Sequence, residues 1–347
     1  MDDPVLDLVC IHWGRRVALA IVQCSSPRNL PTSINHSSPL NSILVGLSSV
    51  LHFQVIEFFI FMVMYLITLA GNCLILFTVR ISPTLHTPMY FFLSNLSFID
   101  ICFSSTIVPL ILINTLSTDK SISVGGCAFQ MFFALTLGAA ECILLAIMAY
   151  DRFTAICRPL HYSSIMNMSF CIILALIPWT IGVIDACIQV ALTWRFSFCR
   201  THHLNHFFCE VPPFFRLSCQ DTWLNEMTIY FAAGIIVLCS FLLTLISYGY
   251  IISTILKIRS SKGRQAVFST CTSRLTVVTL YYGTITFMYI QPRSSHSPET
   301  DRIISDLYTV VTPMLNPIIY SIRNKDVKNS IIKNIKNQAK LSKNILA

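Results

Sequence analysis

The chain alternates between long apolar runs and short polar connections. Seven runs are each long enough to cross a hydrocarbon core of about 30 Å, since a helix rises about 1.5 Å per residue. They are Phe53–Val79, Pro88–Leu112, Cys127–Ile156, Phe170–Leu192, Glu226–Leu256, Gln265–Ile290 and Arg302–Ile322. The sixth run is the weakest because it begins with polar residues. Lipid offers backbone polar groups no partner, so each run is predicted to be an α-helix.

Composition supports this interpretation. Only 12% of the 347 residues are charged, 54% are hydrophobic, and the mean hydropathy is +0.67. A soluble domain carries about a quarter charged residues. We therefore predict an all-α membrane protein, a seven-transmembrane helix bundle. Residues 1–52 form the segment before the bundle, 53–322 the transmembrane domain, and 323–347 the tail.

The distribution of Lys and Arg predicts how the bundle sits in the membrane. Alternate connections and the tail carry most of the basic residues, with Asp151 and Asp326 as the only acids. These basic residues are Arg80, Arg152, Arg158, Lys257, Arg259, Lys262, Arg264, Arg323, Lys325, Lys328, Lys333, Lys336, Lys340 and Lys343. Basic connections face the cytoplasm, which places the N-terminus outside a plasma membrane and the C-terminus inside. The net charge of +8 is therefore explained by the membrane topology and by contact with lipid head groups. Binding to nucleic acid is not predicted.

The tail carries a second apolar pattern. Val327, Ile331, Ile332 and Ile335 recur among lysines after the seventh run. This spacing is typical of a short amphipathic cytoplasmic helix on the inner leaflet. A disordered basic tail is the alternative.

Four cysteines fall on the predicted outer side, namely Cys127, Cys199, Cys209 and Cys219. Disulfides are expected there, and four cysteines allow three pairings. Asn35 opens an Asn-His-Ser sequon, so we predict that it is glycosylated.

Three histidines, His202, His203 and His206, accompany these cysteines. Imidazole and thiolate bind zinc or copper. Disulfide formation removes the thiolates, so we predict a polar loop with no metal and no cofactor.

Two carboxylates lie inside the predicted spans, where charge is costly and indicates function. They are Asp100 and Glu141, and Glu141 lies about 15 Å along its helix from Asp151. Asn72 and Asn316 are predicted to face the same interior. Two buried carboxylates cannot both be charged without a counter-ion, so we predict a sodium ion or a shared proton. A purely structural hydrogen-bond network is the alternative.

Five stretches, read together, resemble one family. They are Met148–Cys157 with Arg158–Tyr162, Pro88–Ser97, Phe268–Cys271, Pro313–Tyr320 and the pair Gly71-Asn72. They occur in the right order over about residues 35–330. The chain resembles an olfactory receptor, a branch of the rhodopsin-like G-protein-coupled receptors. The resemblance implies the disulfides Cys127–Cys209 and Cys199–Cys219.

The resemblance also implies a switch on the cytoplasmic side. Asp151 is expected to hold Arg152 at rest, and Arg152 to insert toward the G protein in the active state. Pro317 breaks a backbone ladder and lets its helix bend. The other implied switch residues are Asn316 and Tyr320 in span seven, Tyr248 that meets Tyr320, and Tyr282 as the aromatic pivot of span six.

Some positions depart from the family pattern. Arg274 stands where the family usually has His, and Phe153 and Thr154 replace a usual Tyr and Val. Residues 1–34 precede the usual start of the family and receive no function. Arg274 places a permanent charge at the entrance to span six, which is expected to alter coupling or basal activity.

The ligand pocket is expected in the outer half of spans three, five, six and seven. Helical spacing below Cys127 and the facing spans give Met131, Leu135, Gly138, Ala139, Cys142, Ile285, Tyr289 and Thr309. Asp185, in the outer half of span four, is within reach of this pocket. A mainly apolar pocket suits a small volatile odorant of modest affinity.

The resemblance implies a receptor that works by population shift. The odorant binds better to a state in which the inner end of span six is displaced, and a stimulatory heterotrimeric G protein then raises cAMP. A transporter would show paired broken helices or repeats, and the chain has neither. It also lacks HExxH and GxSxG motifs, so no enzyme is predicted. The sequence does not separate an olfactory role from one outside the nose.

Overall fold

The computed structural model describes residues 42–44, 51–117, 121–195, 203–204, 208–215, 218, 221–257, 275, 278–279, 281–286, 303–323 and 327–333. Within these ranges, five helices are long and apolar enough to cross a membrane. They are α2 (Leu51–Ile81), α3 (Pro88–Leu116), α4 (Val124–Cys157), α6 (Met168–Thr193) and α8 (Trp223–Leu256). They correspond in order to the first five predicted spans.

The last two predicted spans are described in part. Residues 281–286 are helical and belong to the sixth. The seventh contains a π-helical turn, η4 (Leu307–Val311), followed by α11 (Thr312–Arg323). The sequence pattern did not predict the π-helical turn. α11 continues through Pro317, so in this structure the proline does not end the helix.

Helices α4 and α6 begin before their predicted limits because polar caps lie just outside the apolar runs. α4 begins three residues before Cys127, where the Ser123 side chain accepts a hydrogen bond from the Gly126 N–H at 3.1 Å. α6 begins after Asn167, whose side chain caps the Phe170 N–H at 2.9 Å. Hydropathy does not count such residues, so the predicted ends were short.

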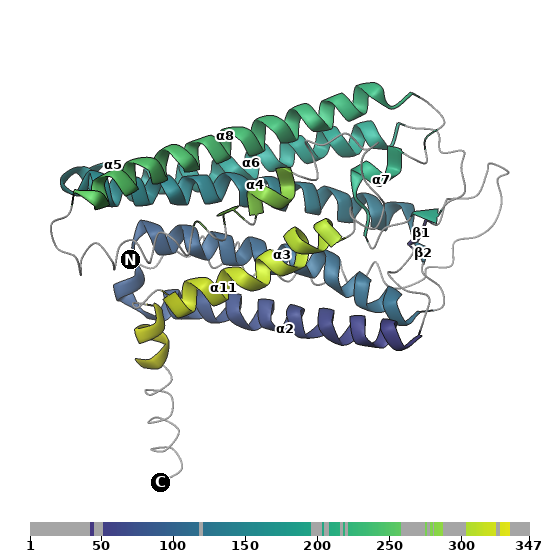
Figure 1. Cartoon of the computed structure of the whole chain (residues 1–347), viewed down its shortest axis with the longest axis horizontal. Helices are drawn as coiled ribbons and strands as arrows, with labels where there is room; N and C mark the ends of the chain where they lie inside the picture. Colours follow the sequence, from purple (N-terminus) through teal and green to yellow (C-terminus); the bar gives the residue numbers. More distant parts are fainter. Residues whose placement is uncertain are drawn as a thin grey trace, which may run out of the picture.

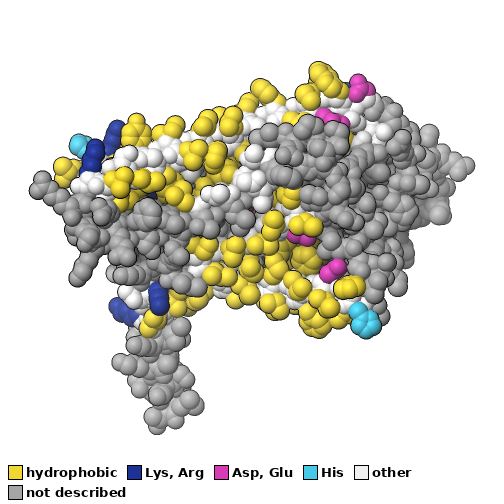
Figure 2. Space-filling view, viewed as in Figure 1, with side chains coloured by type: hydrophobic (Ala, Val, Ile, Leu, Met, Phe, Trp, Pro, Cys, Tyr) yellow, Lys and Arg dark blue, Asp and Glu magenta, His cyan; other side chains and the backbone are white. Residues whose placement is uncertain are grey.

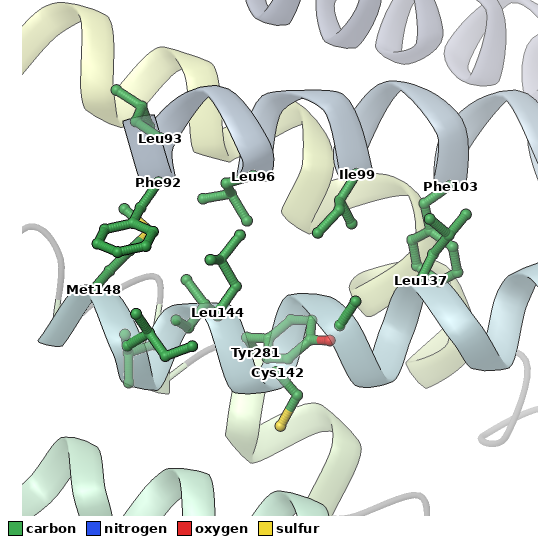
Figure 3. Packing of buried hydrophobic residues seen from close by; sticks show 14 of the residues in the cluster. Phe92, Leu93, Leu96, Ile99, Phe103, Leu137, Cys142, Leu144, Met148 and Tyr281 are labelled. Carbon is green, nitrogen blue, oxygen red and sulfur yellow. The ribbon is translucent and has the colours of Figure 1, made fainter. Parts of the chain in front are cut away.

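Helix α4 lies at the centre of the described bundle. It packs against α3, α6 and α8, while α2 packs against α3 and α11 (Figure 1). Phe92, Ile99 and Phe103 of α3 point toward α4, which contributes Leu144 and Met148 to the shared core (Figure 3). All five side chains are buried, so van der Waals contact holds these helices together.

Two glycines allow unusually close helix contacts. A Cβ at Gly182 of α6 would lie 2.5 Å from the backbone oxygen of Thr136 in α4. A Cβ at Gly71 of α2 would lie 2.8 Å from Cβ of Pro317 in α11. Neither position has room for a side chain. Small residues at such positions let the backbones of membrane helices approach closely.

The two ends of the bundle differ in charge. One end carries α5 (Tyr162–Ile165) and is called the α5 end; the other carries α7 (Val211–Phe215) and is called the α7 end. On the face drawn in Figure 2, the visible Lys and Arg side chains lie toward the α5 end and the visible acidic ones toward the α7 end. Between them, large hydrophobic side chains of α2, α6 and α8 are exposed. This apolar surface suits contact with lipid.

Short elements complete the described chain. β1 (Ser42–Leu44) pairs antiparallel with β2 (Ser121–Ile122) and parallel with β3 (His203–Leu204). Such short strands carry no readable alternation, so the sequence did not predict them. Single 3₁₀ turns, η1 (Pro83–Leu85) and η2 (Pro159–His161), lie at the α5 end. The predicted tail helix is present at residues 327–333, and its Val327 is buried in the core.

Candidate ligand cavity and buried polar network

A cavity opens between the helices toward the α7 end, with a volume of about 90 Å³. α3, α4, α6, α8, residues 281–286 and η4 all contribute to its wall. Seven predicted pocket residues line it, namely Met131, Leu135, Gly138, Ala139, Cys142, Ile285 and Thr309. The eighth, Tyr289, lies outside the described residues. The five residues that helical spacing selected on α4 therefore meet Ile285 and Thr309 of the facing segments around one cavity.

The segment before α7 covers this cavity and is fixed to α4 and α3. Cys127 and Cys209 form a disulfide with a Cα–Cα distance of 5.4 Å. The Cys209 N–H donates to Oε1 of Gln130 at 2.9 Å, and Nε2 of Gln130 donates to the Thr106 oxygen at 2.9 Å. Gln130 is thus a second anchor that the sequence did not reveal. The other expected disulfide, Cys199–Cys219, falls outside the described residues, as does Asn35.

Two carboxylates also line the cavity: Asp185, which the sequence placed within reach of the pocket, and Glu210, which it did not. Glu210, only 5% exposed, accepts hydrogen bonds from the hydroxyls of Tyr308 and Ser305. Asp185 of α6 accepts from Nε2 of Gln189 at 3.3 Å. The residues predicted for the pocket did not include Glu210. Its position directly after the anchored Cys209 was the signal that could have placed it.

Two tyrosines join residues 281–286 to α4 beside the cavity. The Tyr281 hydroxyl donates to the Gly138 oxygen, and the Tyr282 hydroxyl donates to the Cys142 oxygen, both at 2.8 Å. Both rings are buried, and the Tyr282 ring lies 5.5 Å from that of Phe241 in α8. Tyr281 lies beside Cys142 in the core (Figure 3). The sequence singled out Tyr282, whose role as a pivot stays a prediction, but it did not single out Tyr281.

A buried polar network lies in the middle of the bundle. Nδ2 of Asn316 is 3.1 Å from both carboxylate oxygens of Asp100 and 3.4 Å from Oε1 of Glu141. The structure therefore brings together three of the four predicted residues. Asn72 is buried nearby but donates to backbone oxygens, at 3.0 Å to Thr68 and 3.3 Å to Pro313.

Oxygen ligands are plentiful in this network. Oε2 of Glu141 and Oδ1 of Asn316 are buried and make no hydrogen bond within the described part of the chain. A hard cation such as sodium prefers carboxylate and amide oxygens, so these residues fit a sodium ion. They fit a shared proton equally well, because a proton also removes the repulsion between two carboxylates.

At the α5 end, Asp151 is buried and Oδ1 accepts a hydrogen bond from the Tyr162 hydroxyl at 2.8 Å. Burial raises the pKa of Tyr162, and the Asp151 carboxylate adds to this rise. Arg152 is half-buried beside it. That Asp151 holds Arg152 stays a prediction, whereas the bond from Tyr162 is a contact that the sequence did not show.

The remaining switch residues are described in part. Tyr248 of α8 is buried in a small cluster with Ala149, Ile251 and Ile255. The side chain of Tyr320 lies outside the described residues, and so does Arg274. The expected contact between Tyr248 and Tyr320 therefore stays a prediction.

Comparison with known proteins gives a consistent result. A family model described as olfactory receptor matches residues 61–338. Olfactory receptor 5B12 of Homo sapiens is 46% identical over 301 residues, which cover 87% of this chain and 96% of the relative. Olfactory receptor 5AR1 of Mus musculus is 45% identical over 294 residues, covering 85% of this chain and 95% of the relative. The chain belongs to the olfactory receptor family, whose members are odorant receptors of the plasma membrane that couple to G proteins and are not enzymes.

Proposed function

We propose that this odorant receptor binds a small volatile molecule in the cavity and signals through a stimulatory G protein that raises cAMP. One observation carries the proposal: five residues of span three chosen by helical spacing and two residues of the facing spans line a single cavity. Its wall is mostly apolar, with hydroxyls from Tyr281, Tyr308 and Thr309. Such a site binds by dispersion and one or two hydrogen bonds, which suits a volatile organic compound.

The cavity volume favours small ligands. An engineered cavity of about 150 Å³ binds benzene, and this cavity is smaller at about 90 Å³. Small molecules bury little surface, so modest affinity is expected. Larger odorants require side chains in the wall to move.

Two hydrogen bonds link the wall of the cavity to span six, whose displacement is proposed to activate the G protein. Gly138 and Cys142 line the cavity and also accept the hydroxyls of Tyr281 and Tyr282. A ligand that fits better when these bonds are rearranged favours a state with span six displaced. In this proposal the displaced span exposes Arg152, and the switch includes Asp151, Tyr248, Tyr282, Asn316, Pro317 and Tyr320.

The proposed orientation has the α5 end in the cytoplasm and residues 1–52 outside. The gathering of Lys and Arg at the α5 end supports it, because basic residues accumulate on the cytoplasmic side (Figure 2). Residues 53–322 then form the transmembrane domain and 323–347 the cytoplasmic tail. Asp100, Glu141 and Asn316, next to Asn72, are proposed to bind sodium or to share a proton. A structural hydrogen-bond network remains the alternative.

A cavity-filling variant tests the proposal. A Cβ at Gly138 would meet nothing within 4 Å, so Gly138→Val should fold while its methyl groups occupy the cavity. We expect its cAMP response to a panel of volatiles to require about ten-fold more odorant, or to disappear. Gly249→Val is the matched control, because Gly249 of α8 is also open and does not line the cavity.

Two results would contradict the proposal. Responses of Gly138→Val equal to those of the wild type, at equal surface expression, would place the ligand elsewhere. An unchanged response in Arg152→Ala would remove Arg152 from coupling.

A further inference from the structure

The charged residues in the described wall of the cavity are all acidic. Asp185 from α6 and Glu210 from the segment before α7 both line it. Among the described residues of its wall, none is Lys, Arg or His. The other polar side-chain groups of the described wall are hydroxyls, the Cys142 thiol and the disulfide sulfur of Cys209. Within the described part of the wall, the only formal charges are therefore negative.

The two carboxylates differ in their hydrogen-bond partners. Glu210 accepts the hydroxyls of Tyr308 and Ser305, which hold it in place. Asp185 is half-buried, and its hydrogen bond within the described chain comes from the Gln189 amide at 3.3 Å. An amide brings no positive charge. Asp185 therefore keeps acceptor capacity and lacks a described counter-charge.

A carboxylate in this place is costly. Asp185 lies within α6, one of the membrane-crossing helices, eight residues before its last residue, Thr193. Ionisable groups at such depth are expensive unless they pair with an opposite charge or reach water, and they commonly mark a ligand path. Since Asp185 lines the cavity, a cationic ligand in the cavity can supply that opposite charge.

We propose that the cavity selects ligands that carry a protonated amine. The ammonium donates to the Asp185 carboxylate, and the alkyl part lies against apolar wall residues such as Met131, Leu135 and Ile229. Glu210 adds to the negative potential, so the anions of carboxylic acids are disfavoured. This inference rests on the proposed function, that the cavity is the odorant site.

The test compares compounds with one carbon skeleton and different head groups. Cells that express the receptor are exposed to the primary amines propylamine to octylamine, to the matching alcohols and to the matching carboxylates, with cAMP as the readout. We expect the amines to be the strongest agonists. Asp185→Asn should raise the concentration needed for half-maximal response to the amine by about ten-fold or more, and leave responses to alcohols nearly unchanged.

Two further variants control for folding and charge. Asp185→Glu keeps the negative charge and should keep most of the amine response. Glu226→Gln removes a carboxylate near the α7 end that does not line the cavity, and should respond like the wild type. Antibody labelling of intact cells normalises each response to surface expression.

The outcomes separate this inference from the proposal on which it rests. Stronger responses to carboxylates than to amines, or an unchanged amine response in Asp185→Asn, overturn the amine selectivity. Responses to neutral volatiles with none to amines also overturn it but leave the cavity as the odorant site. If Gly138→Val keeps every response, the odorant site itself is wrong.

Discussion

The Tyr162 hydroxyl donates a 2.8 Å hydrogen bond to Oδ1 of Asp151, although Tyr162 belongs to the short helix α5 and Asp151 to the end of α4. Asp151 is buried, so this bond satisfies one oxygen of a carboxylate that water cannot reach. In the proposed switch, Asp151 restrains Arg152. Tyr162 then restrains Asp151, and α5 becomes part of the resting state.

The first prediction concerns this restraint. Tyr162→Phe removes the hydroxyl and leaves the ring, so Asp151 loses a hydrogen bond to a charged group, a contact worth about 1.5–3 kcal/mol. We expect basal cAMP, at equal surface expression, to rise by about three- to ten-fold. Tyr65→Phe is the control, because the Tyr65 hydroxyl contacts Ser105 at 3.0 Å, away from the switch. Equal basal signalling in both variants would remove Tyr162 from the resting latch.

The second prediction concerns pH. Burial, and then the Asp151 carboxylate, raise the pKa of Tyr162 above its usual value of about 10. A raised pKa favours the protonated form, so the hydroxyl remains a donor until pH rises above about 10. The difference in basal activity between wild type and Tyr162→Phe should therefore be the same at about pH 6 and about pH 8. Nucleotide exchange on a purified G protein added to receptor membranes measures it. A difference that vanishes at the lower pH would show that another group controls the contact.

The third prediction concerns the anchor of the cavity cover. Gln130→Met keeps the shape of the side chain but removes both its bond from Cys209 and its bond to Thr106. The buried Cys209 N–H then loses its partner, at a cost of about 1–3 kcal/mol, and the part-buried Thr106 oxygen of α3 loses the bond from Gln130. We expect a lower melting temperature of the purified receptor and a weaker odorant response. Thr228→Val is the control, because Thr228 bonds only within α8 in the described structure. Unchanged melting in Gln130→Met would mean that the disulfide alone holds the cover.

The fourth prediction concerns the contact between α4 and α6. In Gly182→Ala the added Cβ would lie 2.5 Å from the Thr136 oxygen, a backbone atom that cannot rotate away. The helices must separate, which typically costs about 1–3 kcal/mol. Reduced thermal stability and surface expression are expected. Gly234→Ala adds the same methyl group to α8 where nothing lies within 4 Å, so it should be neutral or stabilising. Equal stability of the two variants would contradict the close packing.

The fifth prediction separates the alternatives for the polar network. If sodium binds Asp100 and Glu141, replacing sodium chloride with choline chloride should lower the melting temperature of the wild type by a few degrees, roughly as ligand removal does. Asp100→Asn should melt at the same temperature in both salts. Glu226→Gln, outside the network, should behave like the wild type. If the wild type melts at the same temperature in both salts, sodium binding is excluded, and the shared proton or the structural network remains.

The local pattern of apolar and polar residues was enough to predict much of the architecture. The first five spans were predicted in place because lipid demands long apolar helices, and such helices leave a strong signal. Helical periodicity also placed Met131, Leu135 and Gly138 on one face of α4, since residues three and four apart share a face. Asp100 and Glu141 stood out because charge is rare in such runs.

The tertiary structure decided what these residues touch. No pattern shows that Asn316 bridges Asp100 and Glu141, that Tyr162 reaches Asp151, or that Glu210 turns into the bundle to meet Tyr308. Asn316 lies 216 residues from Asp100, and Tyr308 lies 98 residues from Glu210, whereas Tyr162 is only 11 residues from Asp151. In each case the packing of the helices brings the two side chains within hydrogen-bond distance. The sequence by itself determined a lipid-embedded bundle with charges in its interior, because solvent preference is a property of each residue. Which charges meet, and which remain available to a ligand, depends on contacts between helices, which only the folded chain contains.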